Sequence, residues 1–137
     1  MFRATTLFFV LTISSASYGA NESIGVLNCK KEMVNLERKL AGFKTAIDTS
    51  NTVKLSELQM LAKESSFGLI NNCAAIQLEK SDHETLGKAS GSGVSLAVSI
   101  KHYLNWASQD KYQSTLVLQH IKQNYNEFIN DIQAFNK

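Results

Sequence analysis

The sequence predicts an all-α fold, arranged as an antiparallel up-down-up-down four-helix bundle with one disulfide. Three observations support this fold class. Apolar residues recur at alternating spacings of three and four over several long segments, which is the pattern of amphipathic helices. The 137 residues contain no proline. No stretch alternates apolar and polar residues as a strand does, and no hairpin-turn signal is present. Short polar connectors between the helical segments favour a bundle.

The first 20 residues have the pattern of a secretory signal peptide. Arg3 supplies a positive start, residues 7–13 an apolar core, and residues 14–20 a run of mostly small residues suited to cleavage after Gly19 or Ala20. The apolar core is too short to cross a bilayer about 30 Å thick as a helix. The alternative is an apolar N-terminal helix that packs on the body. We therefore expect a mature domain over 21–137, periplasmic or secreted, with no membrane span after cleavage. It opens with an N-glycosylation sequon at Asn21.

Two facing helices are expected over 23–47 and 53–79, with Gly42 as a weak point in the first. The first carries an apolar stripe made of Val26, Cys29, Met33, Leu36, Leu40, Phe43 and Ile47. The second carries Leu55, Leu58, Ala62, Ser65, Leu69, Cys73 and Ile76, with one slip in spacing near its end. A reversal near Asn51 places Leu40 opposite Ala62, which allows large-into-small packing. It also places Cys29 level with Cys73, and in an exported chain these two cysteines predict a disulfide. Two free buried thiols are the alternative.

The third helix has an ambiguous beginning. Ser81 and Glu84 fit a capping box, which predicts a helix start at Asp82. Three glycines follow between residues 87 and 93. We favour a flexible connection around Ser90–Gly93, because glycine and serine resist ordering. The alternative is a continuous helix whose small residues let a neighbour approach closely. From Val94 the helical pattern is clear.

The last helix is expected to begin after Asp110, which is a suitable N-cap. Its inward stripe consists of Leu118, Ile121, Tyr125, Phe128, Ile132 and Phe135. This stripe is unbroken over five turns, so the helix should run close to the end of the chain.

Charge and motif content exclude several function classes. The formal net charge is +2, with acids interspersed among the lysines, so no nucleic-acid footprint is visible. His83, His102 and His120 match no metal-ligand spacing and are expected to be solvated or to cap helices. The segment Gly91–Ser95 lacks the strand that a serine nucleophile elbow needs. The acidic residues have no spacing that predicts two carboxyls converging across a cleft. The sequence therefore predicts no catalytic or metal site.

Three aromatic residues near the last turn are not needed for the core stripes. Tyr103, Trp106 and Tyr112 flank the polar break at residues 108–110. Exposed tyrosine and tryptophan often anchor protein contacts, because they bury much area at a low entropy cost. We expect these three residues to form a partner-binding patch.

Parts of the chain resemble the exported, periplasmic b-type cytochromes, which fold as antiparallel four-helix bundles. The similarity runs over residues 33–36 with Leu40 and Ala46, over 53–54 with Met60, and over Ile100, Leu104, Ala107 and Lys111. In that family a methionine early in the first helix and a histidine near the end of the last hold haem. Met33 matches the methionine, but the position matching the histidine is near Asn130. The resemblance thus implies haem b held by Met33 with His120 or His102.

Two functional hypotheses follow from these observations. The first is a small exported, non-enzymatic protein that binds a protein partner in the cell envelope, as an inhibitor, immunity protein, chaperone or accessory factor. It requires no cofactor. The alternative is a periplasmic haem-binding electron carrier, as the resemblance to b-type cytochromes implies.

Overall fold

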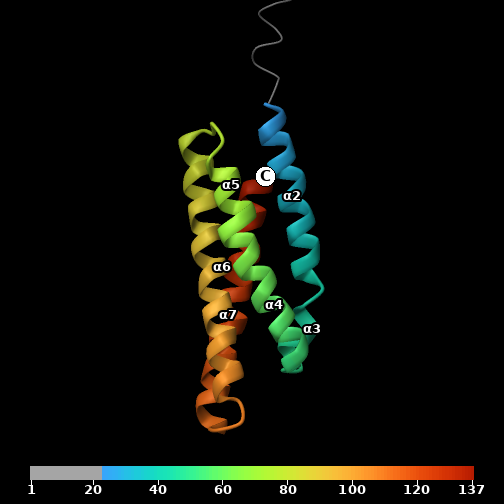
Figure 1. Ribbon diagram of the computed structural model, residues 1–137, viewed down its shortest axis with the longest axis vertical. Coiled ribbons are helices and arrows are strands. Elements are labelled where there is room, and N and C mark those ends of the chain that lie inside the picture. Colours follow the sequence, from blue (N-terminus) through green and yellow to red (C-terminus); the bar gives the residue numbers. More distant parts are fainter. Residues whose placement is uncertain (1–22) are drawn as a thin grey trace, which may run out of the picture.

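A computed structural model describes residues 23–137, and this part of the chain is all-helical with one disulfide, as predicted (Figure 1). Four helical segments follow one another. They are α2 (Ile24–Ala41) with α3 (Lys44–Asp48); α4 (Thr52–Glu64) with the π-helix η1 (Ser65–Ile70) and α5 (Asn71–Ala74); α6 (Lys80–Trp106); and α7 (Lys111–Asn136). The predicted signal peptide and the sequon at Asn21 lie outside the described residues.

The first segment begins as expected and breaks earlier than expected. The Ser23 side chain caps α2 by accepting a hydrogen bond of 3.3 Å from the backbone N–H of Val26. Of the predicted inward residues in α2, Cys29, Met33, Leu36 and Leu40 are buried, whereas Val26 in the first turn is only partly buried. The helix does not run unbroken to Ile47, however. It ends at Ala41, and Gly42 lies in a turn before α3 begins, because glycine has a high entropic cost in a helix.

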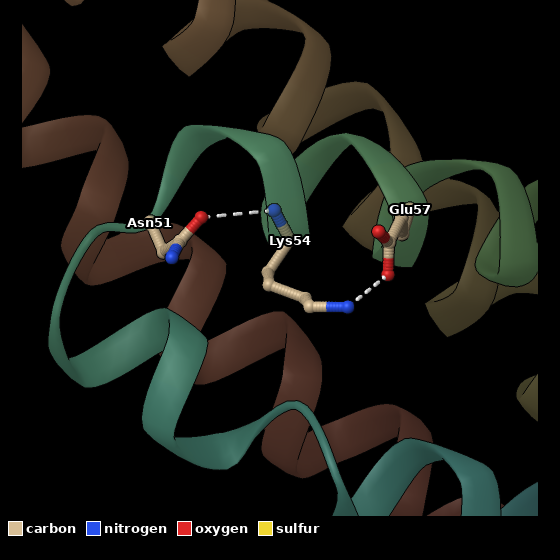
Figure 2. A network of polar contacts seen from close by, with 3 residues as sticks. All are labelled: Asn51, Lys54 and Glu57. Carbon is tan, nitrogen blue, oxygen red and sulfur yellow. Dashed lines mark hydrogen bonds and ion pairs between the residues drawn. The ribbon is translucent and has the colours of Figure 1, made fainter.

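The second segment begins at a side-chain cap. Asn51 accepts a hydrogen bond of 3.1 Å from the N–H of Lys54, whose ammonium is 2.7 Å from Glu57 (Figure 2). Both charged side chains are about half exposed, so this ion pair contributes little to stability. The cap explains why a helix starts here after the polar connector.

The slip in the second stripe corresponds to the π-helix η1. Up to Ser65 the buried positions follow the predicted stripe, and then burial passes to Ser66 and Ile70. The predicted Leu69 is only partly buried. A π-turn contains more residues than an α-turn, so the positions that face the core shift by one residue. Ile70 is buried in place of the predicted Leu69, and Cys73 is buried as predicted. The segment ends at Ala74, shorter than the predicted end near residue 79.

The helices do not pair as the sequence suggested. The most extensive contacts join α6 with α7, α4 with α6, and α2 with α7. Between α2 and the second segment lies a groove of about 200 Å³ that Leu36 and Ser65 line. The cysteines nevertheless meet at one end of these segments, where the Cα atoms of Cys29 and Cys73 are 5.7 Å apart. The predicted disulfide is confirmed. The first segment packs mainly against α7, and the second segment packs mainly against α6.

Helix α6 is continuous through all three of its glycines, so the predicted flexible connection around Ser90–Gly93 is wrong. Gly93 is buried against η1 and α7. A Cβ at this position would lie 2.9 Å from two ring atoms of Phe128 and closer still to the Ser66 hydroxyl. The alternative interpretation is therefore correct: the small residues admit a closely packed neighbour.

The predicted capping box at the start of α6 is also wrong. The helix begins at Lys80, and its N-cap residue Glu79 makes no side-chain capping bond. The Ser81 carbonyl instead accepts a hydrogen bond of 2.9 Å from the Thr85 hydroxyl within the helix. Ser81 therefore acts as an ordinary helical residue.

Helix α7 matches its prediction closely. Asp110 caps it by accepting hydrogen bonds from the N–H groups of Tyr112 and Gln113, at 2.8 and 3.1 Å. The inward stripe is buried from its second member onward, through Ile121, Tyr125, Phe128, Ile132 and Phe135. Leu118 is partly buried. This stripe completes the core.

Candidate functional site at the α6–α7 tip

The turn that joins α6 to α7 projects beyond the rest of the described structure. Figure 1 shows it extending past α3 and the first turn of α4 along the long axis. The ion pair of Lys122 with Asp48, at 3.8 Å, marks the level at which α3 ends. From Lys122 back to Lys111, α7 continues for a further length of about 16 Å at 1.5 Å per residue. At this tip α6 and α7 are therefore partnered mainly by each other.

The structure separates the three aromatic residues of the predicted partner-binding patch. Trp106 is 47% exposed and Tyr112 is 71% exposed, so both are available at the tip. Tyr103 is only 8% exposed and belongs to the core. It lies three positions after the fully buried Ile100, which puts it on the inward face of α6. The expectation that Tyr103 is exposed is therefore wrong.

Leu116 is exposed at the same tip, although the sequence did not single it out. Its exposed fraction is 37%, and it follows Tyr112 by one helical turn. We call Trp106, Tyr112 and Leu116 the tip surface. The i, i+4 spacing of Tyr112 and Leu116, away from the inward stripe, is the signal that could have identified the pair.

A cleft of about 530 Å³ opens beside Trp106. Two turns of helix form its walls: His102 and Trp106 are four positions apart in α6, and Gln113 and Val117 four apart in α7. Asp110, the N-cap residue of α7, also lines the cleft. The cleft thus combines an indole and an aliphatic wall with an imidazole, an amide and a carboxylate. This mixture suits a side chain that has both an apolar and a polar part.

The side chains of all three histidines are exposed, which agrees with the expectation of solvated residues. His83 lies near the start of α6, His102 lines the tip cleft, and His120 lies on α7. Residues 23–137 contain no group of three or more histidine, cysteine, aspartate or glutamate side chains placed to hold a metal ion. The side chain of Ser92, from the segment considered as a nucleophile loop, donates to the Ala89 carbonyl at 3.1 Å inside α6.

Met33 and His120, the proposed haem ligands, are not brought together. Met33 is fully buried, whereas His120 is exposed. Gln133 of α7 donates to Glu37 of α2 at 2.8 Å, which places these two residues level. His120 lies thirteen positions before Gln133, about 20 Å along the helix axis. Met33 lies one helical turn before Glu37, on the side of Glu37 that faces away from His120. It is therefore even farther from His120 than Glu37 is. The haem hypothesis stays a prediction from the resemblance.

Glu37 is partly buried and accepts from two amides. Besides Gln133, the side-chain nitrogen of Asn136 lies 3.4 Å from Glu37. These contacts attach the end of α7 to α2. They are structural links between helices rather than a site.

No helix among residues 23–137 combines the length and apolarity needed to cross a bilayer. Comparison of the chain with protein-family models, with curated proteins and with solved structures finds no match.

Proposed function

We propose that this is an exported, non-enzymatic helical protein that binds a protein partner in the cell envelope through the tip surface. The observation that carries the proposal is the half-exposed Trp106 beside a cleft at a projecting tip. A half-exposed tryptophan leaves part of its apolar ring surface in contact with water, which is unfavourable. Burial against a partner would recover that free energy, and tryptophan is enriched among residues that dominate binding.

Export is supported by two features of different kinds. The N-terminal 20 residues have the composition of a secretory signal peptide. The Cys29–Cys73 disulfide is typical of oxidising compartments such as the periplasm. Together they favour a periplasmic or secreted protein.

The scaffold proposed for this function is an antiparallel up-down-up-down bundle. Glu37 of α2 contacts Gln133 of α7, and Asp48 at the end of α3 contacts Lys122, which comes earlier in α7. This order supports opposite chain directions for the first segment and α7. The short connector from Trp106 to Lys111 gives α6 and α7 the same opposed sense. Such a bundle would hold the tip rigidly, which lowers the entropic cost of binding.

Affinity capture with matched variants tests the proposal. The mature protein, the double variant Trp106→Ala/Tyr112→Ala, and the control Val53→Ala/Met60→Ala would each be immobilised and exposed to envelope extract. The control removes exposed apolar side chains of similar exposure from α4. We expect one partner to bind the wild type and the control, and to be recovered at least tenfold less by the tip variant. Thermal melts should show that all three proteins are folded.

Equal recovery by the tip variant would contradict the proposal, because the surface that carries it would then be irrelevant. Loss of capture by the α4 control alone would move the binding surface to α4.

A further inference from the structure

We propose that the tip cleft receives the side chain of an arginine presented by the partner, with the guanidinium held between the Trp106 indole and the Asp110 carboxylate. This inference rests on the proposed function and specifies the chemistry of its partner. It is carried by the charge of the cleft, by the hydrogen bonding of Asp110, and by the shape of its walls.

The charge of the cleft favours a cation. Among the five residues that line it, Asp110 is the one that bears a formal charge when histidine is counted as neutral. The lysines nearest in sequence, Lys101 and Lys111, do not line it. An occupant that carries a positive charge would therefore meet a carboxylate, whereas an acidic occupant would be repelled by it.

Asp110 keeps binding capacity after it has capped α7. Both of its capping hydrogen bonds, from Tyr112 and Gln113, end on Oδ1. Oδ2 takes part in none of the hydrogen bonds or ion pairs found among residues 23–137. A carboxylate offers about four lone-pair positions. A guanidinium could thus donate to Oδ2 while the helix cap stays intact.

The walls favour arginine over other cations. Trp106 of α6 is about half exposed and lines the cleft, and tryptophan is the aromatic residue with the strongest attraction for a cation above its ring face. Val117 lines the opposite wall, where the aliphatic stem of the occupant would pack. The planar guanidinium stacks on an aromatic ring and forks toward acceptors, which the compact lysine ammonium does not do. Gln113 also lines the cleft, and its side-chain amide would supply a further acceptor for the guanidinium.

Tryptophan fluorescence provides a direct test, because Trp106 is the single tryptophan of the chain. Three nonapeptides, identical except for arginine, citrulline or glutamate at the centre, would be titrated into the mature protein. Citrulline keeps the shape of arginine and lacks its charge. We expect the arginine peptide to change Trp106 emission saturably and to bind at least tenfold more tightly than the citrulline peptide.

The variant Asp110→Asn removes the charge and preserves the helix cap, since asparagine caps as well as aspartate. We expect it to melt like the wild type and to lose the preference for arginine over citrulline. The control Glu84→Gln removes an exposed acid near the other end of α6 and should keep that preference. Equal affinity for arginine and citrulline, tighter binding of the glutamate peptide, no saturable response, or an unchanged Asp110→Asn variant would each overturn the inference.

The two proposals can fail separately. If envelope capture depends on Trp106 but is unchanged in Asp110→Asn, the protein-binding function stands and the arginine is wrong. If the arginine peptide binds as expected but no partner is captured in a Trp106-dependent way, the cleft chemistry is right and the envelope partner is wrong.

Discussion

At the scale of single residues, Tyr125 connects two helices that are far apart in the sequence. Its hydroxyl donates to the Leu40 carbonyl at 2.6 Å, so it links α7 to the last turn of α2. Tyr125 as a whole is 4% exposed. Burial raises the pKa of Tyr125 above its ordinary value near 10, and the charge of Asp48 raises it further. A phenolate at this position would lose the hydrogen bond that the neutral hydroxyl donates.

Replacement Tyr125→Phe should lower the free energy of unfolding by about 1 kcal/mol, because it leaves the Leu40 carbonyl with one partner fewer. Urea unfolding at neutral pH measures this difference. Since the pKa is raised in the folded state, the stability that Tyr125 contributes is present below about pH 10 and is lost as the pH rises further. Wild-type stability should therefore fall more steeply in alkali than that of Tyr125→Phe. The exposed control Tyr112→Phe should change neither quantity; parallel alkaline profiles for wild type and Tyr125→Phe would contradict the argument.

At the scale of elements, α6 owes its continuity to packing that its local sequence opposes. Glycines at positions 87, 91 and 93 each disfavour a helix. They differ in their surroundings, however. A Cβ at Gly91 would meet nothing within 4 Å, whereas one at Gly93 would overlap Ser66 and Phe128. The close approach of η1 and α7 to α6 at Gly93 offsets part of the low helix propensity.

This difference predicts opposite effects for two similar substitutions. Gly91→Ala should raise the free energy of unfolding by up to about 1 kcal/mol, the gain in helix propensity at an open position. Gly93→Ala should lower it by about 1–3 kcal/mol, because the added methyl overpacks the core. Chemical denaturation of the two variants measures both effects. Stabilisation by both substitutions would show that α6 does not pack closely at Gly93.

The π-helix η1 makes a second contribution at this scale. It turns Ser66 inward against α6, where its hydroxyl is fully buried and has no hydrogen-bond partner within the described structure. Its backbone carbonyl lies 3.4 Å from the Ser90 hydroxyl of α6. The small side chains at this crossing keep the helices close, and the change of phase then brings Ile70 and Cys73 into the core.

At the scale of the whole molecule, the disulfide and the contacts of α7 hold the first segment in place. The disulfide joins the start of α2 to α5, and α2 otherwise packs mainly along α7. The bridged cysteines are 44 positions apart. In the chain-entropy account, closing a loop of this size destabilises the unfolded chain, and so stabilises the protein, by about 4 kcal/mol.

The double variant Cys29→Ser/Cys73→Ser should therefore be less stable than the oxidised wild type by about 2–4 kcal/mol. Thermal and chemical unfolding measure the loss. A reducing agent should bring the wild type to the stability of the variant and leave the variant unchanged. Mass measurement without reduction should show two hydrogens fewer than the free-thiol form; two thiols that react with an alkylating agent in the native protein would contradict the pairing.

The sequence by itself determined the fold class, the disulfide and the cap at Asp110. These features follow from local rules: the period of the apolar residues, the oxidising compartment that the leader implies, and side chains that accept from the first free N–H groups of a helix. The sequence also located Trp106 and Tyr112, because neither residue is needed for an inward stripe.

The tertiary structure alone decided how the elements meet. It made Gly93 a contact point rather than a flexible connection, and it moved Tyr103 from the expected patch into the core. It also brought Asp110, Trp106 and Val117 together around one cleft. The physical reason is the same in each case. Spacing along one helix shows which face is apolar, but the depth of burial and the shape of a cleft depend on which neighbour packs there and how closely.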